Sequence, residues 1–427
     1  MILVIIIFIV LLMLGVPVAF AIAISGTMYF LQHPELPIAT IVQLPISQTQ
    51  NVTLLAVPLF IFAGALMNSS GITKRLVKFS MQLAGHMRGG MAQVSVILST
   101  LMGGCSGSSN ADIAMESQIL GPEMLKQGYS KGFASAVIAY SSLITSTIPP
   151  SVGMLLYGSV GEVSIGRLFT AGITTGIIMM IVLMLLTAIL ARLKNLKPAT
   201  KTKAKFKEII ASLKETIWAL IFPFILLGSL RLGIFTPAEI GAFACVYAVI
   251  IGFFVYKDMN IQILAKTLVE SIKAIGAIML MISMSAIFGY GIPLDKIPQK
   301  MTLFITSITT SPPLVMAIVV LFLVLFGMFM EGSIVIILVT PILIPLIETI
   351  GVDTVLFGVI VCNVVTMGIA TPPVGVGMYI VCSYLGCELI DFVKESIPYL
   401  FAILLVVVIY LSIPEVILFL PNLIFGK

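Results

Sequence analysis

The sequence predicts an all-α polytopic membrane protein with two re-entrant hairpins and two broken helices. Of its 427 residues, 59% are hydrophobic and 10% are charged, and apolar runs of about 20 residues, long enough to span a bilayer, recur along the chain. Glycine, serine and proline interrupt these runs at membrane depth within residues 101–157 and again within residues 326–377. Backbone broken inside a bilayer needs polar partners, so both interruptions predict a polar binding site.

The two interruptions are copies of one pattern. When the sequence is slid along itself so that Gly104 falls on Gly327, further residues of the two regions coincide. These are Ile119-Leu120 with Ile342-Leu343, Pro122 with Pro345, Gly128 with Gly351, and Pro149-Pro150 with Pro372-Pro373. Paired hydrophobic segments broken by glycine or proline in two halves of a chain indicate a transporter binding site.

Residues 1–88 are expected to form N-terminal spans and an amphipathic helix, as part of a scaffold. The apolar run at residues 2–31 is too long for a signal peptide and lacks a basic start, so it predicts a retained first span, kinked at Pro17. A second span is expected at residues 52–67. The basic segment at residues 72–88 is typical of a helix at the membrane interface.

Residues 89–160 are expected to form a first hairpin and a broken helix, as repeat 1 of a transport domain. The apolar runs 90–102 and 111–124 are each too short to cross a bilayer, so they favour a re-entrant hairpin with its tip at residues 106–110. The uncharged span that follows is broken at residues 145–153.

Residues 161–311 are expected to link the two repeats, mainly as scaffold. Spans fit residues 168–191, 216–230, 240–256 and 274–292, with a basic loop at 192–214 and a second interfacial helix at 257–273. Residues 312–385 then form repeat 2 of the transport domain, with a hairpin tip at 327–333 and a helix broken at Pro372-Pro373. Residues 386–427 provide one C-terminal span.

The basic residues predict the orientation. If the loop at residues 192–214 is cytoplasmic, most of the 23 Lys and Arg residues lie inside, as the positive-inside rule requires. The N-terminus is then expected in the cytoplasm and the C-terminus on the far side. The two hairpins enter from opposite faces, which predicts inverted repeats. Because the basic residues lie in these loops, the net charge of +5 does not indicate nucleic-acid binding.

Oxygen-bearing groups concentrate at the two breaks. A desolvated Na⁺ needs several oxygen ligands, which unwound carbonyls and Ser, Thr or Asn side chains supply with little added charge. We therefore predict two clusters of Na⁺ ligands: Gly104, Ser106, Ser108, Asn110, Thr145 and Pro149 in the first, and Gly327, Glu331, Ser333, Thr366, Thr371 and Gly375 in the second. Substrate contacts are expected at Ser106, Ser109, Ser151, Gly332 and Pro373. Close helix packing by small residues is the alternative for both clusters.

Three acidic residues lie near the tips. Glu331 is a functional candidate because burying an acid is costly, and capping of the half-helix that begins at Gly332 is its alternative role. Asp112 and Glu116 are one turn apart on one helix face, where capping or pairing is favoured. Neither tip carries Lys or Arg, so Na⁺, helix dipoles and hydroxyls would balance an anionic substrate.

Several segments resemble, in order, the large membrane subunit (DctM or SiaM type) of the tripartite ATP-independent periplasmic (TRAP) transporters. The similar segments are Gly15-Val16-Pro17-Val18-Ala19-Phe20, Ala56-Val57-Pro58-Leu59-Phe60, Gly103-Gly104-Cys105-Ser106-Gly107-Ser108-Ser109, Ile148-Pro149-Pro150-Ser151, residues 328–333, and Thr371-Pro372-Pro373-Val374-Gly375. The likeness covers nearly the whole chain.

This resemblance implies a Na⁺-driven importer of an organic acid, such as sialic acid or a C4-dicarboxylate, in a bacterial inner membrane. It implies no cofactor besides the coupling ion, and a periplasmic C-terminus. It implies two partners, a periplasmic binding protein of DctP or SiaP type and a separate small four-helix membrane subunit of DctQ or SiaQ type. It also implies an elevator, in which a transport domain holding both hairpins and both broken helices slides against the scaffold.

Other function classes fit less well. A channel would need a continuous polar pore. An enzyme would need a nucleophile beside a base, but His33 and His86 lie near the interfaces and no such group is legible, so no enzymatic activity is predicted. Within transporters, the alternative is a stand-alone Na⁺/divalent-anion symporter of similar inverted-repeat architecture, which would need no binding protein.

Overall fold

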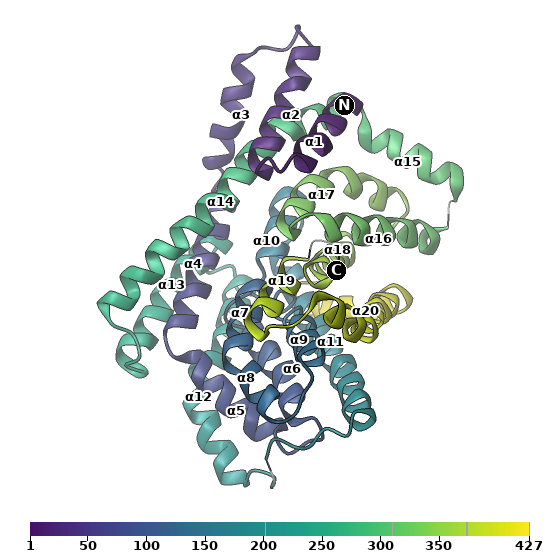
Figure 1. Ribbon diagram of the computed structural model, residues 1–427. Coiled ribbons are helices and arrows are strands. Elements are labelled where there is room, and N and C mark those ends of the chain that lie inside the picture. Colours follow the sequence, from purple (N-terminus) through teal and green to yellow (C-terminus); the bar gives the residue numbers. More distant parts are fainter. Residues whose placement is uncertain (201, 310, 373–374, 427) are drawn as a thin grey trace.

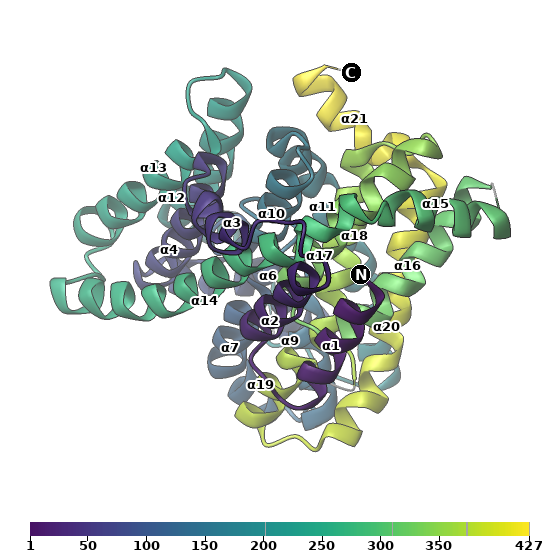
Figure 2. The same ribbon diagram turned by 90° about the horizontal axis from the view of Figure 1, so that it is seen from above.

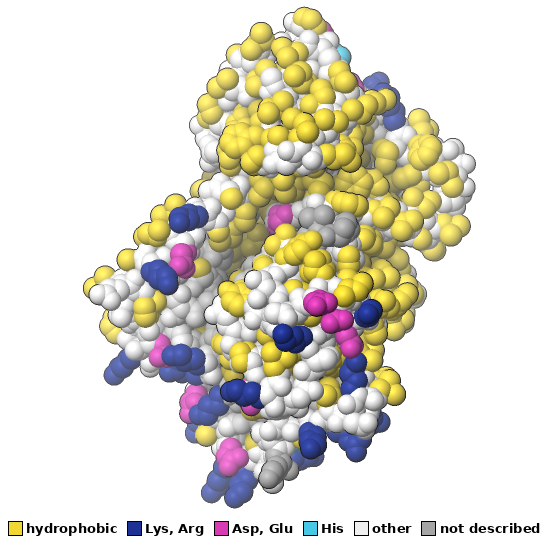
Figure 3. Space-filling view, in the orientation of Figure 1, with side chains coloured by type: hydrophobic (Ala, Val, Ile, Leu, Met, Phe, Trp, Pro, Cys, Tyr) yellow, Lys and Arg dark blue, Asp and Glu magenta, His cyan; other side chains and the backbone are white. Residues whose placement is uncertain are grey.

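The computed structural model describes residues 1–200, 202–309, 311–372 and 375–426, and within these ranges the regular elements are helices and none is a strand (Figure 1). Within the described part of the chain, eight helices are long and apolar enough to cross a membrane. Apolar side chains cover much of the surface, while Lys and Arg gather at one end of the molecule, over α5 (Ile72–Ala84) and the start of α12 (Phe206–Arg231) (Figure 3). We call this the basic end. The predicted all-α polytopic membrane fold is confirmed.

Helices end at the predicted breaks in both segments for which hairpins and broken helices are predicted. Repeat 1 contains α6 (Gly90–Gly103), α7 (Ser109–Ile119), α8 (Gly121–Lys126), α9 (Lys131–Ser141) and α10 (Val152–Val160). Repeat 2 contains α16 (Pro312–Phe329), α17 (Gly332–Thr349), α18 (Thr354–Met367), the short turn η3 (Gly368–Ala370) and α19 (Val376–Leu385). Side-chain caps fix several of these ends, because Ser130, Ser151 and Asp353 each accept a hydrogen bond from the first turn of the helix that follows.

The remaining helices flank this unit. α4 (Ala56–Ser69), α12 and α13 (Pro237–Ile250) lie on one side, and α20 (Leu389–Ser412) lies on the other (Figure 2). α4 packs against α13 and against the long helix α14 (Ile261–Leu294), which also contacts α2 (Val18–Gln32) and α3 (Ala39–Thr49). We call α2, α3, α4, α13 and α14 the outer group.

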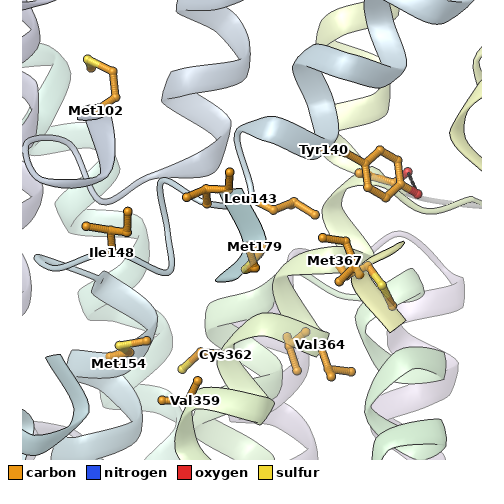
Figure 4. Close-up of a cluster of buried hydrophobic side chains, with 14 of the residues drawn as sticks. Met102, Tyr140, Leu143, Ile148, Met154, Met179, Val359, Cys362, Val364 and Met367 are labelled. Atoms are coloured by element: carbon orange, nitrogen blue, oxygen red, sulfur yellow. Dashed lines mark hydrogen bonds between the residues drawn. The ribbon is translucent and has the colours of Figure 1, made fainter. Parts of the chain in front are cut away.

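The core lies where the two broken helices meet α11 (Ile165–Leu193). Ile148 from the first break, Met179 from α11 and Cys362 from α18 belong to one buried cluster there (Figure 4). The surrounding side chains are almost fully buried, so a break in either helix is enclosed by protein and not by lipid. This enclosure is what unpaired backbone requires at membrane depth.

The N-terminal region differs from the prediction. α1 (Ile2–Met13) and α2 form a helical hairpin, because Gly15 adopts a left-handed conformation (φ +77°) and Pro17 ends the turn. A single kinked span at residues 2–31 is therefore wrong. Proline at a turn breaks the helix completely when the preceding glycine lets the chain reverse.

The same hairpin moves the N-terminus to the other end of the molecule. The amino group of Met1 donates to Asp295 Oδ2 at 2.7 Å, directly after the end of α14. α14 starts at the basic end, where Arg75 donates to Asp258 at 2.6 Å and so holds the pKa of Asp258 below its ordinary value. A helix of 34 residues is about 50 Å long, so Met1 lies opposite the basic end. The prediction that the N-terminus and the basic loop both lie in the cytoplasm is therefore wrong, because the two lie at opposite ends of the molecule.

Three further segments were not predicted correctly. α14 is one continuous helix, because no glycine or proline interrupts residues 261–275, so the separate interfacial helix at 257–273 is wrong. α3 and α15 (Ile297–Ile308) were assigned to no element. The C-terminal span is divided at Ile413 into α20 and α21 (Pro414–Phe425), and α21 packs on α11, where Arg167 donates to Asn422 Oδ1 at 2.8 Å.

Candidate functional site

One cavity of about 370 Å³ brings the two hairpin tips together. Residues 106–111 of tip 1 and residues 331–333 of tip 2 line it, with Ser146 from the first break and Thr366 from the end of α18. The opposite wall belongs to the outer group, with Asn68 and neighbouring residues from α4 and Glu270 and Ser271 from α14. The cavity therefore lies between the two repeats on one side and the outer group on the other.

Two close backbone contacts hold tip 1. Gly107 has a left-handed backbone (φ +61°), and a Cβ atom built on it would coincide with the Pro150 carbonyl oxygen in the first break. A Cβ atom on Gly64 of α4 would lie 2.6 Å from the Ser106 carbonyl oxygen. Tip 1 is thus in contact with the broken helix behind it and with the outer group in front, and both contacts need glycine.

Tip 1 presents oxygen atoms without hydrogen-bond partners. Ser106 Oγ, Ser109 Oγ and Asn110 Oδ1 are buried and accept or donate no hydrogen bond to other described residues, and all three residues line the cavity. A buried polar atom left unpaired costs free energy, so such atoms are retained where something else binds them. Oxygen atoms of this kind are the ligands that hard cations prefer.

Tip 2 is closed by its own carboxylate. Glu331 accepts from the Ser333 backbone nitrogen at 3.1 Å and from Ser333 Oγ at 3.0 Å, so it caps α17. The capping hypothesis for Glu331 is confirmed. Because Glu331 also lines the cavity and a carboxylate can accept about four hydrogen bonds, capping leaves oxygen lone pairs for a ligand.

The cavity gathers only part of the predicted site. Its lining includes Ser106, Ser108, Ser109, Asn110, Glu331, Gly332, Ser333 and Thr366. The predicted residues Gly104, Thr145, Pro149, Ser151, Gly327, Thr371 and Gly375 are not in that lining. Pro373 lies outside the described residues.

The predicted hydroxyl residues outside the cavity lining form hydrogen bonds with neighbouring groups. Thr145 lies against Asp112 Oδ2 (2.6 Å) and the Ser99 carbonyl oxygen (2.9 Å), as donor to one or the other. Ser151 donates to the Ser146 carbonyl oxygen and caps α10. Thr371 donates to the Met367 carbonyl oxygen at 2.8 Å. These side chains stabilise the two breaks and do not face the cavity in this conformation.

Asp112 and Glu116 lie behind tip 1 and are almost completely buried. Glu116 accepts from Ser95 and from Ser99 (2.8 Å), and Asp112 accepts from Thr145. Among the described residues neither acid caps a helix or forms an ion pair, because Ser108 is the cap of α7. The capping or pairing role favoured for them is therefore wrong. Hydroxyl groups contact both Glu116 carboxylate oxygens and Asp112 Oδ2, while Asp112 Oδ1 has no hydrogen-bond partner among the described residues.

The two segments predicted as repeats contact each other through exchanged positions. Thr147 Oγ1 donates to Asn363 Oδ1 at 2.5 Å, and the Tyr140 hydroxyl donates to the Ala370 carbonyl oxygen at 3.4 Å. In the slide that places Gly104 on Gly327, Tyr140 falls on Asn363 and Thr147 on Ala370. The helices pack in the same reciprocal way. In the slide α7 corresponds to α17 and α10 to α19, and α10 contacts α17 while α19 contacts α7. A two-fold relation produces reciprocal contacts of this kind.

The described lining holds no Lys, Arg or His and two acids, Glu270 and Glu331. Lys266 lies 3.9 Å from Glu270, one helical turn away on α14 and outside the lining. The cavity therefore offers hydroxyl, amide and carboxylate oxygens but no fixed positive side chain.

A family model decides the assignment. The model described as "Tripartite ATP-independent periplasmic transporter, DctM component" matches residues 5–416. The chain belongs to this family.

Relatives of the DctM family agree. The chain is 33% identical to the C4-dicarboxylate TRAP transporter large permease protein DctM of Pseudomonas aeruginosa, over 88% of this chain and 87% of the relative. It is 32% identical to the sialic acid TRAP transporter large permease protein SiaM of Vibrio cholerae, over 97% of each. It is 30% identical to the sialic acid TRAP transporter permease protein SiaT of Haemophilus influenzae, over 98% of this chain and 67% of the relative. The predicted resemblance is confirmed.

Sequence reasoning missed the outer wall of this TRAP permease cavity. Gly64, Asn68, Glu270 and Ser271 lie outside both repeats. Gly64 is an ordinary small residue in an apolar helix, and Glu270 belongs to a segment whose charges indicate an interface. Neither has a local signal for a binding site, because only the folding of α4 and α14 against the tips brings them there.

Proposed function

We propose that this chain is the large permease of a Na⁺-coupled secondary transporter that imports an organic acid anion. The observation that carries the proposal is the convergence of both tips on one cavity with unpaired oxygens and no positive side chain in its described lining. Na⁺ bound at the tips supplies the missing positive charge. The anion class follows the relatives, whose names include C4-dicarboxylate and sialic acid.

The membership of the TRAP family supports two partners for this chain. A substrate-binding protein delivers the anion in the periplasm, and a small membrane subunit packs beside the permease. The matched region covers 67% of SiaT, so part of that relative lies outside it.

Transport follows an elevator in a bacterial inner membrane. The reciprocal contacts between α9 and η3, and between the first break and α18, support inverted repeats that move as one transport domain. The outer group is the scaffold, and Gly64 of α4 lies against the Ser106 backbone of tip 1. With the basic end in the cytoplasm, Met1 and Asn422 both lie on the periplasmic side.

Uptake is expected to follow a Na⁺ gradient. In proteoliposomes that contain the permease, its small subunit and the loaded binding protein, an inward Na⁺ gradient should drive accumulation without ATP, because the tips bind Na⁺ and substrate together. Labelled substrate inside the vesicles is measured. Equal accumulation with K⁺ in place of Na⁺ would refute the proposal, and accumulation without the binding protein would favour a stand-alone symporter.

Ser106→Ala is expected to weaken Na⁺ binding. The change removes a buried oxygen without a hydrogen-bond partner, so the fold loses little while the ion loses a ligand. The half-saturating Na⁺ concentration should rise about 10-fold, which corresponds to ~1.4 kcal/mol. Ser135→Ala is the matched control, because Ser135 Oγ is also buried and unpaired but lies on α9 outside the cavity lining. If both variants behave alike, Ser106 serves packing only.

A further inference from the structure

Thr147 and Asn363 form a polar contact at the point where the two broken helices cross. Thr147 belongs to the first break and is 1% exposed, and Asn363 lies in α18 and is 3% exposed. The Thr147 hydroxyl lies 2.5 Å from Asn363 Oδ1. The flanking residues Cys362 and Val364 are apolar and buried. An amide in such surroundings costs free energy unless its hydrogen bonds are made.

The Asn363 amide is only half satisfied. Its Oδ1 accepts from Thr147, but its Nδ2 has no hydrogen-bond partner among the described residues. Thr147, in contrast, lies within reach of two other acceptors, the Leu143 carbonyl oxygen at 3.1 Å and Met179 Sδ at 3.5 Å. Thr147 thus does not need Asn363 for its own satisfaction. A packing role alone does not explain an amide here, because leucine would fill the space without an unpaired donor.

The Thr147–Asn363 contact connects the segments that lie beside the two tips. On one side, Thr147 lies next to Ser146, which lines the cavity beside tip 1. On the other side, Asn363 precedes Thr366, which lines the cavity beside tip 2, by about one helical turn. A Cβ atom built on Gly368, just beyond α18, would coincide with the Gly327 carbonyl oxygen at the base of tip 2. A shift of either break is therefore transmitted through rigid, close-packed segments.

We propose that the Thr147–Asn363 contact couples the two Na⁺ sites, so that an ion at one tip raises the affinity of the other. The proposal rests on the Na⁺ coupling proposed above. An ion at tip 1 orders the first break and fixes the Thr147 hydroxyl, which orients Asn363 and with it the end of α18. The coupling is reciprocal, because each ion changes the affinity for the other by the same factor. Both residues are positioning residues and touch neither ion.

The test compares Asn363→Leu and Thr147→Val with the unaltered permease. Na⁺ dependence is measured both by uptake in proteoliposomes and by Na⁺ titration of the purified protein's melting temperature. The unaltered protein should show a Hill coefficient above 1. In either variant the coefficient should fall to about 1 and half-saturation should rise about 3- to 10-fold, within the usual range of site coupling. The double variant should be no worse than the singles, because both remove one interaction.

Two controls separate coupling from folding. Thr147→Ser keeps the hydroxyl and should keep the Hill coefficient, so the Val and Ser pair decides the question even if Asn363→Leu does not fold. Thr187→Val removes another buried contact between helices, with the Tyr399 hydroxyl at 3.2 Å, and should leave the coefficient unchanged. An unchanged coefficient in Thr147→Val, or a coefficient of 1 in the unaltered protein, overturns the coupling. Uptake that ignores Na⁺ altogether overturns the proposed function instead.

Discussion

A permease with Gly107→Ala is expected to enter the membrane and to transport no substrate. The added Cβ atom would coincide with the Pro150 carbonyl oxygen, and a backbone oxygen in a close-packed break cannot move aside as a side chain can. Tip 1 must shift instead, and with it the oxygens of Ser106 and Asn110. Uptake in proteoliposomes should fall to background, with near-normal yield from the membrane.

Gly128→Ala is the matched control for this effect. Gly128 also has a left-handed backbone (φ +87°), but a Cβ atom there would meet no atom within 4 Å. Both variants bear the strain of a left-handed alanine, about 1–2 kcal/mol. Only Gly107→Ala adds a collision, so Gly128→Ala should transport at a near-normal rate with a slightly lower melting temperature. Normal transport by Gly107→Ala would mean that tip 1 does not need its observed position.

The two tips are expected to keep a constant separation while both move against α4. Spin labels are attached to cysteines at Ser109 and Gly332 in one sample, and at Ser109 and Ala65 in another, after removal of the five native cysteines. Gly332 accepts a side chain, because an added Cβ atom would meet only Val365 at 3.5 Å. Between inward and outward states the first distance should stay the same, and the second should change by about a helix diameter, ~10 Å.

This experiment distinguishes the elevator from two other movements. Rocking of two symmetric halves would change the distance between the tips, because each tip would follow its own half. Local gating by one hairpin would also change it, and would leave most of the unit fixed against α4. The contacts between repeats, through Thr147 with Asn363 and Tyr140 with Ala370, are the reason to expect a rigid unit.

The helix breaks could be predicted from sequence because two local signals combine there. Glycine or proline within an apolar run predicts a helix interruption whatever the tertiary packing. The alignment of Gly104 with Gly327 indicates that the interruption occurs twice. The N-terminal hairpin had only Gly15 and Pro17, which fit a kink as well as a reversal. Contacts of α2 with α14, far away in the sequence, decide between the two.

The sequence indicates which types of residue line the cavity, but not which side chains point into it. Ser106 and Thr145 are both hydroxyl residues beside a break, yet Ser106 lines the cavity and Thr145 turns to Asp112. Periodicity does not give the direction of a side chain in a non-helical segment, because only regular elements have a period. For the same reason, the outer wall with Asn68 and Glu270 depends on how separate helices pack.

The proposed Na⁺ coupling, together with a cavity whose described lining has no Lys, Arg or His, implies a response of transport to voltage. A fixed positive side chain would move back and forth with the transport domain and add no net charge to the cycle. Mobile ions instead leave with the substrate, so each Na⁺ beyond the charge of the anion carries one positive charge inward. With an ion at each tip and a monoanion, a membrane potential of 100 mV, negative inside, contributes about 2.3 kcal/mol per cycle. Under the proposed coupling, accumulation is expected to depend on the membrane potential as well as on the Na⁺ concentrations.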